Sequence, residues 1–291
     1  MNTDHSACVN PSSSPTHLEG RTGSRTLGWL LAAAVVATLG VLVGPKPATA
    51  GEVADRVATS GRLKVCIWPD YYGISLRNPR TQQLEGLDIE LSAELARDLG
   101  VQLDYVESSF PTLVADLNEQ RCDVGMFAIA MLPQRLQQLA FTRPYLQSDI
   151  YAVTTKSSAV VRRWEDIDRP GVAVAVQAGT CMEPVMAAAL KNARLVRVAP
   201  PTTRERELEA GRVDVFMTDY PYSRRLLDNA DWARLVSPPA PFHVLPYAYA
   251  VKQGDPDWLA KVDSFVQRIQ RDGRLLAAAR RHRLGDIVQL R

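Results

Sequence analysis

The sequence is poor in metal-binding residues and carries little excess charge of either sign. Histidine and cysteine number four each among 291 residues, and the formal net charge is +2. None of the cysteine spacings resembles a zinc or iron–sulfur site. A balanced charge gives no argument for binding nucleic acid or an acidic membrane surface. The sequence therefore predicts no metal, no other cofactor and no nucleic-acid partner.

A long apolar run is also missing. The main apolar stretch, residues 29–43, is short for a membrane span, which needs about 20 apolar residues. Arg21 and Arg25 precede it, and Ala48-Thr-Ala50 follows it. A positive flank, a short apolar core and small residues are typical of a secretory signal peptide, so residues 1–50 are predicted to be cleaved off after export. An uncleaved membrane anchor is the alternative.

Few cysteines remain in the predicted mature chain. Its 241 residues, with 31 basic and 30 acidic side chains, are enough for two modest lobes or one large domain. An exported protein can form disulfides. Cys66 lies in one predicted strand and Cys122 begins another, so we expect a bridge between them if those strands are neighbours. Cys181 would then stay free.

Strand-length apolar runs alternate with helical patterns along the chain. A first series has strands at 61–68, 101–106 and 124–129, with one intervening helix capped by Asp88 and another starting at Pro111. A second series has strands at 171–177, 194–198 and 213–219, again with helices between them. Such alternation predicts an α/β fold with mostly parallel sheets flanked by helices.

A charged residue stands at the carboxyl end of one buried strand in each series. Arg135 follows the run 124–129, and Asp219 ends the run 213–219. Ligands of open α/β sheets bind outside the carboxyl ends of the strands. Arg135 could therefore hold a carboxylate, and Asp219 an ammonium group. The alternatives are a solvated arginine and an N-cap, although Asp219 can serve in both of its roles.

A sharp turn at 178–183 leads into another helix. Thr180 and Glu183 have the spacing of a T-x-x-E capping box. The free amides at a helix start bind anions well, which makes Thr180 a candidate ligand-binding residue. The alternative is that these residues only begin the helix.

The order of these motifs resembles the bacterial extracellular solute-binding proteins of family 3, the periplasmic receptors for polar amino acids. The resemblance covers roughly residues 62–284. Its matching segments are Gly86-Leu-Asp88, Asp123 to Arg135, Phe141 to Tyr145, Val176 to Thr180, Gly211 to Asp214 with Asp219, and Pro246 to Val251 followed by Gly254-Asp-Pro256.

The resemblance implies a two-lobed periplasmic binding protein fold of type II. Lobe 1 would comprise residues 51–153 plus 247–291, and lobe 2 residues 154–246, with hinges near 150–154 and 245–250. It also implies a periplasmic monomer that is not an enzyme. Such a protein captures a small solute by hinge closure and delivers it to an inner-membrane ABC permease or a sensor.

The resemblance also assigns roles to five residues. Arg135 falls on the arginine that binds the α-carboxylate of the ligand, and Thr180 on the residue that assists it. Asp219 falls on the acid that takes the α-ammonium. Tyr71 and Phe110 fall on aromatic positions that line the cleft.

The chain departs from the family where a serine and a threonine normally precede the arginine. Ala130 stands at the ligand-contacting serine position, and Leu132 at the threonine position. Losing a hydrogen bond to a charged group costs about 1.5–3 kcal/mol, or about ten- to a hundredfold in affinity. The expected ligand is therefore a small anionic or zwitterionic solute, either amino acid-like or an organic acid.

Two other functions stay open at the level of sequence. A few relatives in the family act as periplasmic dehydratases on carboxylated rings, for which only Glu183 and Asp219 offer an acid or base. No Ser/His/Asp or Cys/His arrangement is legible. The second is a partner-binding module whose cleft has lost its small ligand, which Ala130 and Leu132 favour.

Overall fold

The computed structural model describes residues 51–290, so the predicted signal peptide lies outside the described residues. The first sheet has the strand order β5 (Gln102–Glu107), β1 (Arg62–Ile67), β6 (Val124–Ala130), β14 (Leu245–Lys252) and β7 (Leu139–Phe141), with β8 (Leu146–Ser148) also paired to β14. The second has the order β11 (Arg194–Val198), β10 (Ala173–Gln177), β12 (Val215–Asp219), β9 (Ile150–Thr155) and β13 (Ala233–Val236). A small third sheet contains β2 (Asp70–Tyr71), β3 (Ser75–Arg77) and β4 (Leu84–Glu85).

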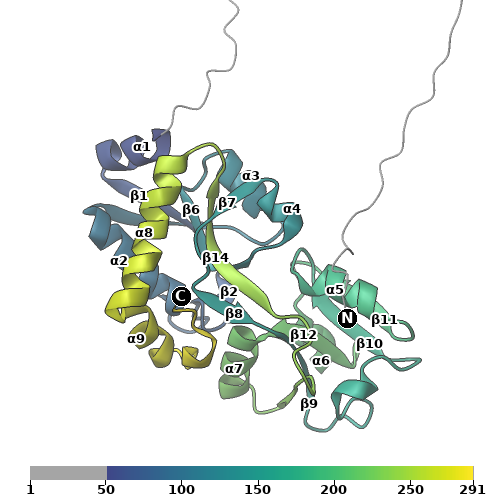
Figure 1. Cartoon of the computed structure of the whole chain (residues 1–291). Helices are drawn as coiled ribbons and strands as arrows, with labels where there is room; N and C mark the ends of the chain where they lie inside the picture. The colour runs from purple at the N-terminus through teal and green to yellow at the C-terminus, as the bar shows by residue number, and fades with distance from the viewer. Residues whose placement is uncertain (1–50, 291) are drawn as a thin grey trace, which may run out of the picture. The chain divides into compact units, whose positions relative to one another are not determined.

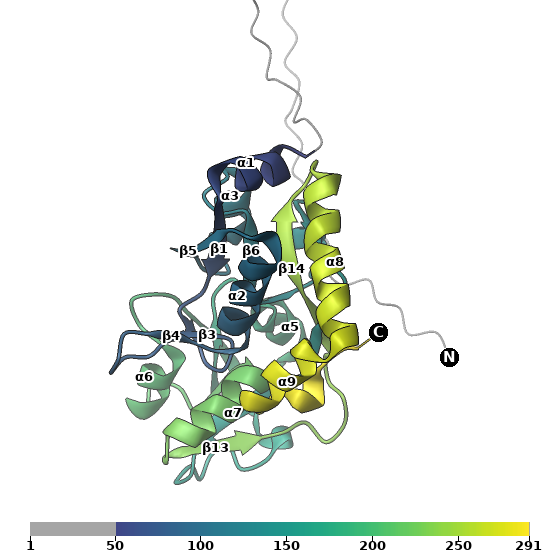
Figure 2. The ribbon, with the colours of Figure 1, turned by 90° about the vertical axis from the view of Figure 1, so that its left-hand side faces the viewer.

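Helices cover both large sheets. They are α1 (Glu52–Ser60), α2 (Leu87–Leu99), α3 (Leu113–Asn118), α4 (Pro133–Leu136), α5 (Met182–Ala189), α6 (Arg204–Glu209), α7 (Tyr220–Asn229), α8 (Pro256–Asp272) and α9 (Arg274–Arg281), with 3-10 turns η1 (Trp164–Asp166) and η2 (Gly285–Ile287). Helices α2, α3 and α8 pack on the first sheet, and α5 to α7 on the second (Figure 1). Figure 2 shows α1 beside the start of α8. None of the described helices is both long and apolar enough to cross a membrane.

The parallel part of each sheet follows the predicted alternation of strands and helices. Strand β1 pairs in parallel with β5 and β6, and β10 pairs in parallel with β11 and β12. Strands β9 and β14 pair antiparallel with β12 and β6. Each sheet is therefore more mixed than the expected mostly parallel arrangement, because the segments that cross between the sheets enter in the opposite direction.

Local sequence explains the burial of β6 and the two ends of α8. Strand β6 is apolar and buried at every position because other elements cover both of its faces. In α8 the side chain of Asp255 accepts from the amide of Trp258 at 2.9 Å, and Gly273, with φ of 86°, ends the helix. The same Asp255 carboxylate accepts from the amides of Gly51 and Val53, which docks α1 on α8.

The prediction that Asp88 caps a helix is wrong. Gly86 is the N-cap of α2, and the side chain of Asp88 is buried instead. A Cβ at Gly86 would lie 2.3 Å from the backbone oxygen of Ile74, so only glycine fits there. This close approach places the helix start two residues earlier and turns the Asp88 carboxylate inward.

Two segments carry the chain between the large sheets. Asp149 separates β8 of the first sheet from β9 of the second, and the return runs from β13 to β14. The Asp149 carboxylate accepts from the amides of Phe242 at 2.8 Å, His243 at 2.6 Å and Ile150 at 2.7 Å. One side chain thus ties the two crossing segments together. The lobe boundaries at 153/154 and 246/247 fall within β9 and β14 and stay predictions.

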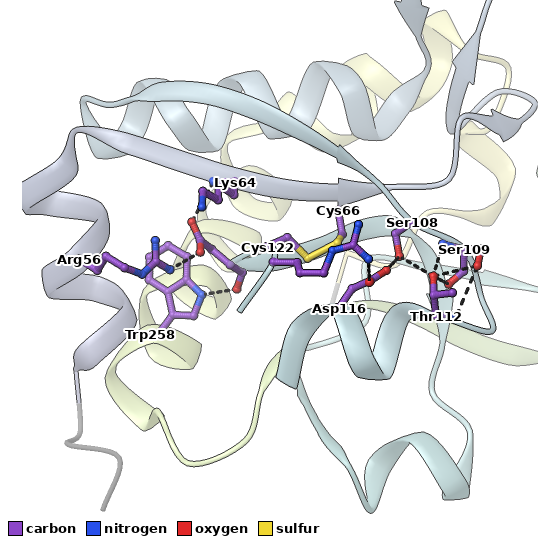
Figure 3. Close-up of a disulfide and its surroundings, with 11 residues drawn as sticks. Arg56, Lys64, Cys66, Ser108, Ser109, Thr112, Asp116, Cys122 and Trp258 are labelled. Atoms are coloured by element: carbon purple, nitrogen blue, oxygen red, sulfur yellow. Dashed lines mark hydrogen bonds and ion pairs between the residues drawn. A yellow bond between two sulfur atoms is a disulfide. The ribbon is translucent and has the colours of Figure 1, made fainter. Parts of the chain in front are cut away.

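A disulfide joins Cys66 in β1 to Cys122 just before β6. The two strands are neighbours, which was the condition set by the sequence, and Cys181 is a free, buried thiol. Figure 3 shows the bridge between two polar clusters. Next to Cys122, Asp123 pairs with Arg56 and accepts at its backbone oxygen from the indole of Trp258 at 2.8 Å.

Candidate ligand-binding site

A pocket with an empty volume of about 350 Å³, open solvent included, is lined by residues in and just after strands of both large sheets and by residues of nearby helices. All six residues that the sequence predicts to bind ligand line it, namely Tyr71, Phe110, Ala130, Arg135, Thr180 and Asp219. The other lining residues are Trp68, Ala128, Cys181, Met182, Arg204, Thr218, Tyr222 and Tyr247. The position agrees with the rule that ligands bind outside the carboxyl ends of parallel strands.

Arg135 is a buried guanidinium at the end of β6. It lies in the short helix α4, which Pro133 begins, and only 5% of it is exposed. Its Nη1 donates to the backbone oxygen of Ala130 at 3.1 Å, and its Nη2 donates to that of Gly179 at 3.0 Å. The guanidinium carbon, Cζ, lies 5.2 Å from the ring centre of Phe110. The reading of Arg135 as a solvated arginine is therefore wrong.

The charge of Arg135 has no carboxylate partner in the described chain. Both of its hydrogen bonds go to neutral backbone oxygens, and it forms no ion pair with a described residue. Burial lowers the pKa of the guanidinium, but arginine stays protonated in proteins. An uncompensated buried charge is costly, so this site is suited to an incoming anion.

Asp219 caps α7 and also faces the cavity, as the sequence allowed. Its Oδ1 accepts from the amide of Tyr222 at 3.1 Å, and its Oδ2 accepts from the hydroxyls of Tyr71 and Tyr247. Burial raises the pKa of the carboxyl, and hydrogen bonds from these three donors oppose that rise. Tyr71 reaches Asp219 from β2, so this contact joins the small sheet to the second large sheet.

Thr180 lines the cavity, but the predicted capping box does not form. Its hydroxyl donates to the backbone oxygen of Gln177 at 2.7 Å, and the N-cap of α5 is Cys181. The helix begins later than the T-x-x-E pattern requires, so the Thr180 hydroxyl closes a turn instead. Glu183 accepts from the amide of Gly179 at 3.0 Å and pairs with Arg197 at 2.6 Å. It lies outside the cavity lining.

Aromatic rings form one wall of the cavity. The ring centres of Trp68 and Phe110 are 5.2 Å apart, and those of Trp68 and Tyr71 are 5.3 Å apart. Phe110 also contacts Phe127 at 5.2 Å. Trp68 ends the first predicted strand, so the rule that pointed to Arg135 could have found it.

Arg204 is the lining residue that sequence reasoning had least chance to find. It begins α6, which reads as polar on all sides, yet only 4% of it is exposed. Its guanidinium carbon, Cζ, lies 4.6 Å from the ring centre of Tyr222 and 5.2 Å from that of Phe216. Arg204 is buried because it packs against these two rings in the folded protein, and no local sequence pattern reveals this packing.

Asp88 holds a residue of the cavity lining in place. Its Oδ2 accepts from the amide of Ala128 at 2.9 Å and the hydroxyl of Tyr145 at 2.6 Å, and its Oδ1 from the hydroxyl of Tyr249 at 3.0 Å. Ala128 lines the cavity with a φ of 47°, which is unusual for a residue with a Cβ. Burial raises the pKa of Asp88 to about 6. The network fixes the strained residue in β6.

The cavity can bind an anion against an apolar wall. Within residues 51–290, no group of three or more histidine, cysteine or acidic side chains is placed to hold a metal ion. Asp219 is the one acidic residue among those that line the cavity.

Solved structures share this architecture. The ancestral amino acid-binding protein AncCDT-1, described as a precursor of cyclohexadienyl dehydratase, is 26% identical to this chain, with a TM-score of 0.71. The match covers 78% of this chain and 97% of that one. The predicted two-lobed periplasmic binding-protein fold is therefore confirmed.

Sequence comparison places the chain within that class. The pattern of the bacterial extracellular solute-binding proteins, family 3, matches residues 63–284, so the chain belongs to this family. Cyclohexadienyl dehydratase of Pseudomonas aeruginosa is 30% identical over 222 residues, which cover 76% of this chain and 82% of that one. The L-cystine-binding protein TcyJ of Escherichia coli K12 is 24% identical over 267 residues, which cover 92% and 98%. The family prediction is thus confirmed.

Proposed function

We propose that this protein is a periplasmic receptor that captures a small anionic or zwitterionic solute. The observation that carries the proposal is Arg135, a buried guanidinium that lines a cavity and has no carboxylate partner among the described residues. A carboxylate of the ligand would supply the missing charge through two charge-assisted hydrogen bonds. Family relatives such as TcyJ, named for binding L-cystine, support a small-molecule ligand.

Closure of two lobes follows from where the lining residues originate. Arg135 and Phe110 come from the part of the chain that forms the first sheet, and Thr180 and Asp219 from the part that forms the second. A ligand that contacts both parts binds the closed arrangement better and so shifts the population toward it. Lobe 1 (51–153 and 247–291) and lobe 2 (154–246) would rotate about the crossing segments tied by Asp149.

Export and delivery complete the proposal. The leader at residues 1–50 would direct the chain to the periplasm, where it would act as a monomer. The loaded protein would dock on an inner-membrane ABC permease for uptake, or on a sensor. A periplasmic location and work with ABC transporters are usual for this family.

A dehydratase activity is the second candidate, favoured by the relative named cyclohexadienyl dehydratase. Asp219 is the one carboxyl among the described residues that line the cavity, and burial raises its pKa, which is the direction that a general acid requires. Three hydrogen-bond donors already surround it, however, and Glu183 is paired with Arg197 away from the cavity. The receptor function therefore has the stronger support.

A thermal-shift screen combined with product analysis separates these functions. Purified protein comprising residues 51–291 is tested against amino acids, organic acids and small amines. A ligand at a hundred times its Kd adds about 2.7 kcal/mol to the free energy of unfolding, which raises the Tm by several degrees. A ligand recovered unchanged establishes the receptor. A ligand recovered as product establishes the enzyme, and no response across the panel favours the partner-binding module.

A further inference from the structure

The cavity contains a second buried guanidinium, that of Arg204. Its Nη1 donates to the backbone oxygen of Met217 at 2.7 Å, and its Nε is buried without a partner. Among the described residues it makes no other hydrogen bond and no ion pair, although it lines the cavity. The rings of Phe216 and Tyr222 hold the guanidinium in place but cannot satisfy its remaining N–H groups.

The charges that line the cavity do not balance. Arg135 and Arg204 are both at least nine-tenths buried, and Asp219 is the one acidic residue among the lining residues. A buried charge is stable only when a partner and hydrogen bonds compensate it. An ionised Asp219 leaves one excess positive charge in the lining, which a single carboxylate would balance, whereas a protonated Asp219 leaves two, which only a dicarboxylate would balance. In both states the buried Nε of Arg204 lacks an acceptor.

Asp219 is also poorly prepared to receive an ammonium group. A carboxylate has about four acceptor positions, and Tyr71, Tyr247 and the amide of Tyr222 already use three of them. About one acceptor position is therefore left for an incoming ammonium group, which could form only a single hydrogen bond to Asp219. Ala130, which has no hydroxyl, removes a further contact for a polar head group.

The remaining walls favour an apolar body. Trp68, Phe110 and Tyr222 present aromatic rings, and Ala128 and Ala130 present methyl groups. Aromatic walls of this kind pack well against a flat or aliphatic carbon frame. Thr180, Thr218 and Asp219 add polar groups to the lining, and the two arginines are its cationic groups.

We propose that the solute is a small dicarboxylate with an apolar body, one carboxylate held by Arg135 and the other by Arg204. This inference rests on the proposed receptor function and narrows its ligand from anionic or zwitterionic solutes to dianions. Arg204 then acts as a specificity-determining residue, because it rejects solutes that lack a second carboxylate.

The test compares matched probes on the wild-type protein comprising residues 51–291. Adipate is paired with hexanoate and isophthalate with benzoate, so that each pair differs by one carboxylate. L-Arginine and L-glutamine represent solutes with an ammonium group. Calorimetric titration should show at least one dicarboxylate binding about tenfold or more tightly than its monocarboxylate partner and than both amino acids, since a hydrogen-bonded charge contributes at least that much.

Variants then assign the preference to Arg204. Arg204→Gln should lower dicarboxylate affinity about ten- to a hundredfold and leave monocarboxylate affinity within about threefold, whereas Arg204→Lys should retain part of the preference. Arg234→Gln is the matched control. Arg234 also has a buried Nε without a partner and donates to a backbone oxygen, that of Val161 at 2.6 Å, but it does not line the cavity.

Three outcomes would overturn the inference, and they can be told apart. An amino acid that binds more tightly than every dicarboxylate would leave the receptor function standing and remove the dianion. Equal affinity of the wild-type protein for the dicarboxylate and the monocarboxylate of each pair would also remove the dianion and leave the receptor function standing. This outcome does not depend on whether the Arg204 variants fold. Binding of none of the probes, together with no hit in the wider screen, would overturn the receptor function as well.

Discussion

The Nη2 of Arg135 donates to the backbone oxygen of Gly179 at 3.0 Å, which joins a residue just after β6 to one just after β10. At the same point, a Cβ on Gly179 would lie 2.9 Å from the Cγ of Pro111. The segments that follow strands of the two large sheets therefore meet closely beside the cavity, and the absence of a side chain at Gly179 permits the contact.

Gly179→Ala should weaken ligand binding about tenfold or more, because the added methyl group would collide with Pro111 and its backbone φ of +76° is already unfavourable for alanine. Gly211→Ala is the control, since Gly211 has a φ of +68° but no neighbour within 4 Å of its Cβ position. Calorimetry measures affinity, and thermal unfolding measures stability. Equal affinities for the two variants would contradict the close contact.

Asp149→Ala should loosen the crossing segments, because three backbone amides lose their acceptor. We expect the free energy of unfolding to fall by about 1–3 kcal/mol and the ligand-free protein to have a larger radius of gyration in X-ray scattering. Asp168→Ala is matched, since Asp168 accepts from the amides of Lys191, Asn192 and Ala193, all within the second half of the chain. Asp168→Ala should lower the free energy of unfolding without changing the radius of gyration. A similar change in scattering for both variants would show that Asp149 has no special role in the crossing.

Asp88 should make stability fall as the pH rises from about 4 to about 7, relative to Asp88→Asn. Burial raises the native pKa from the ordinary 3.8 to about 6, so the native carboxyl keeps its proton where the unfolded chain has lost it. The stabilisation that comes from this raised pKa is complete below about pH 4 and is lost as the pH rises through about 6. Between these limits the free energy of unfolding should fall by about 3 kcal/mol. Urea unfolding of both proteins at several pH values measures it. A pH-independent difference between them would exclude this ionisation.

Reduction of the Cys66–Cys122 bridge should lower stability by about 2–4 kcal/mol, because the bridge restricts a long loop of the unfolded chain. Under non-reducing conditions the unfolded mature protein should titrate with one thiol, that of Cys181. Burial raises the pKa of this thiol to about 12, so it should react slowly before unfolding. Three thiols in freshly exported protein would rule out the bridge.

Local patterns located the strand ends, and with them the predicted site. Arg135 and Asp219 follow buried apolar strands, so one rule about sheets identified both without any knowledge of distant contacts. The helix α1 was missed because it is fixed by Asp255, more than 200 positions away.

Contacts between distant segments account for the other errors. The approach of Gly86 to the backbone of Ile74 turns Asp88 inward, and the packing of Arg204 on Phe216 and Tyr222 brings it to the cavity. Periodicity and spacing report neighbours along the chain, whereas these positions depend on neighbours in space.

The most direct test of the account is calorimetric titration of a screened ligand into wild-type, Arg135→Ala and Arg135→Lys protein. Removing a buried guanidinium that pairs with a carboxylate should weaken binding about a hundredfold in the alanine variant, while lysine, without the forked donor geometry, should recover only part of it. The Tm without ligand should stay close to the wild-type value, because the lost hydrogen bonds are offset by relief of the buried charge. Wild-type affinity in Arg135→Ala would contradict the account.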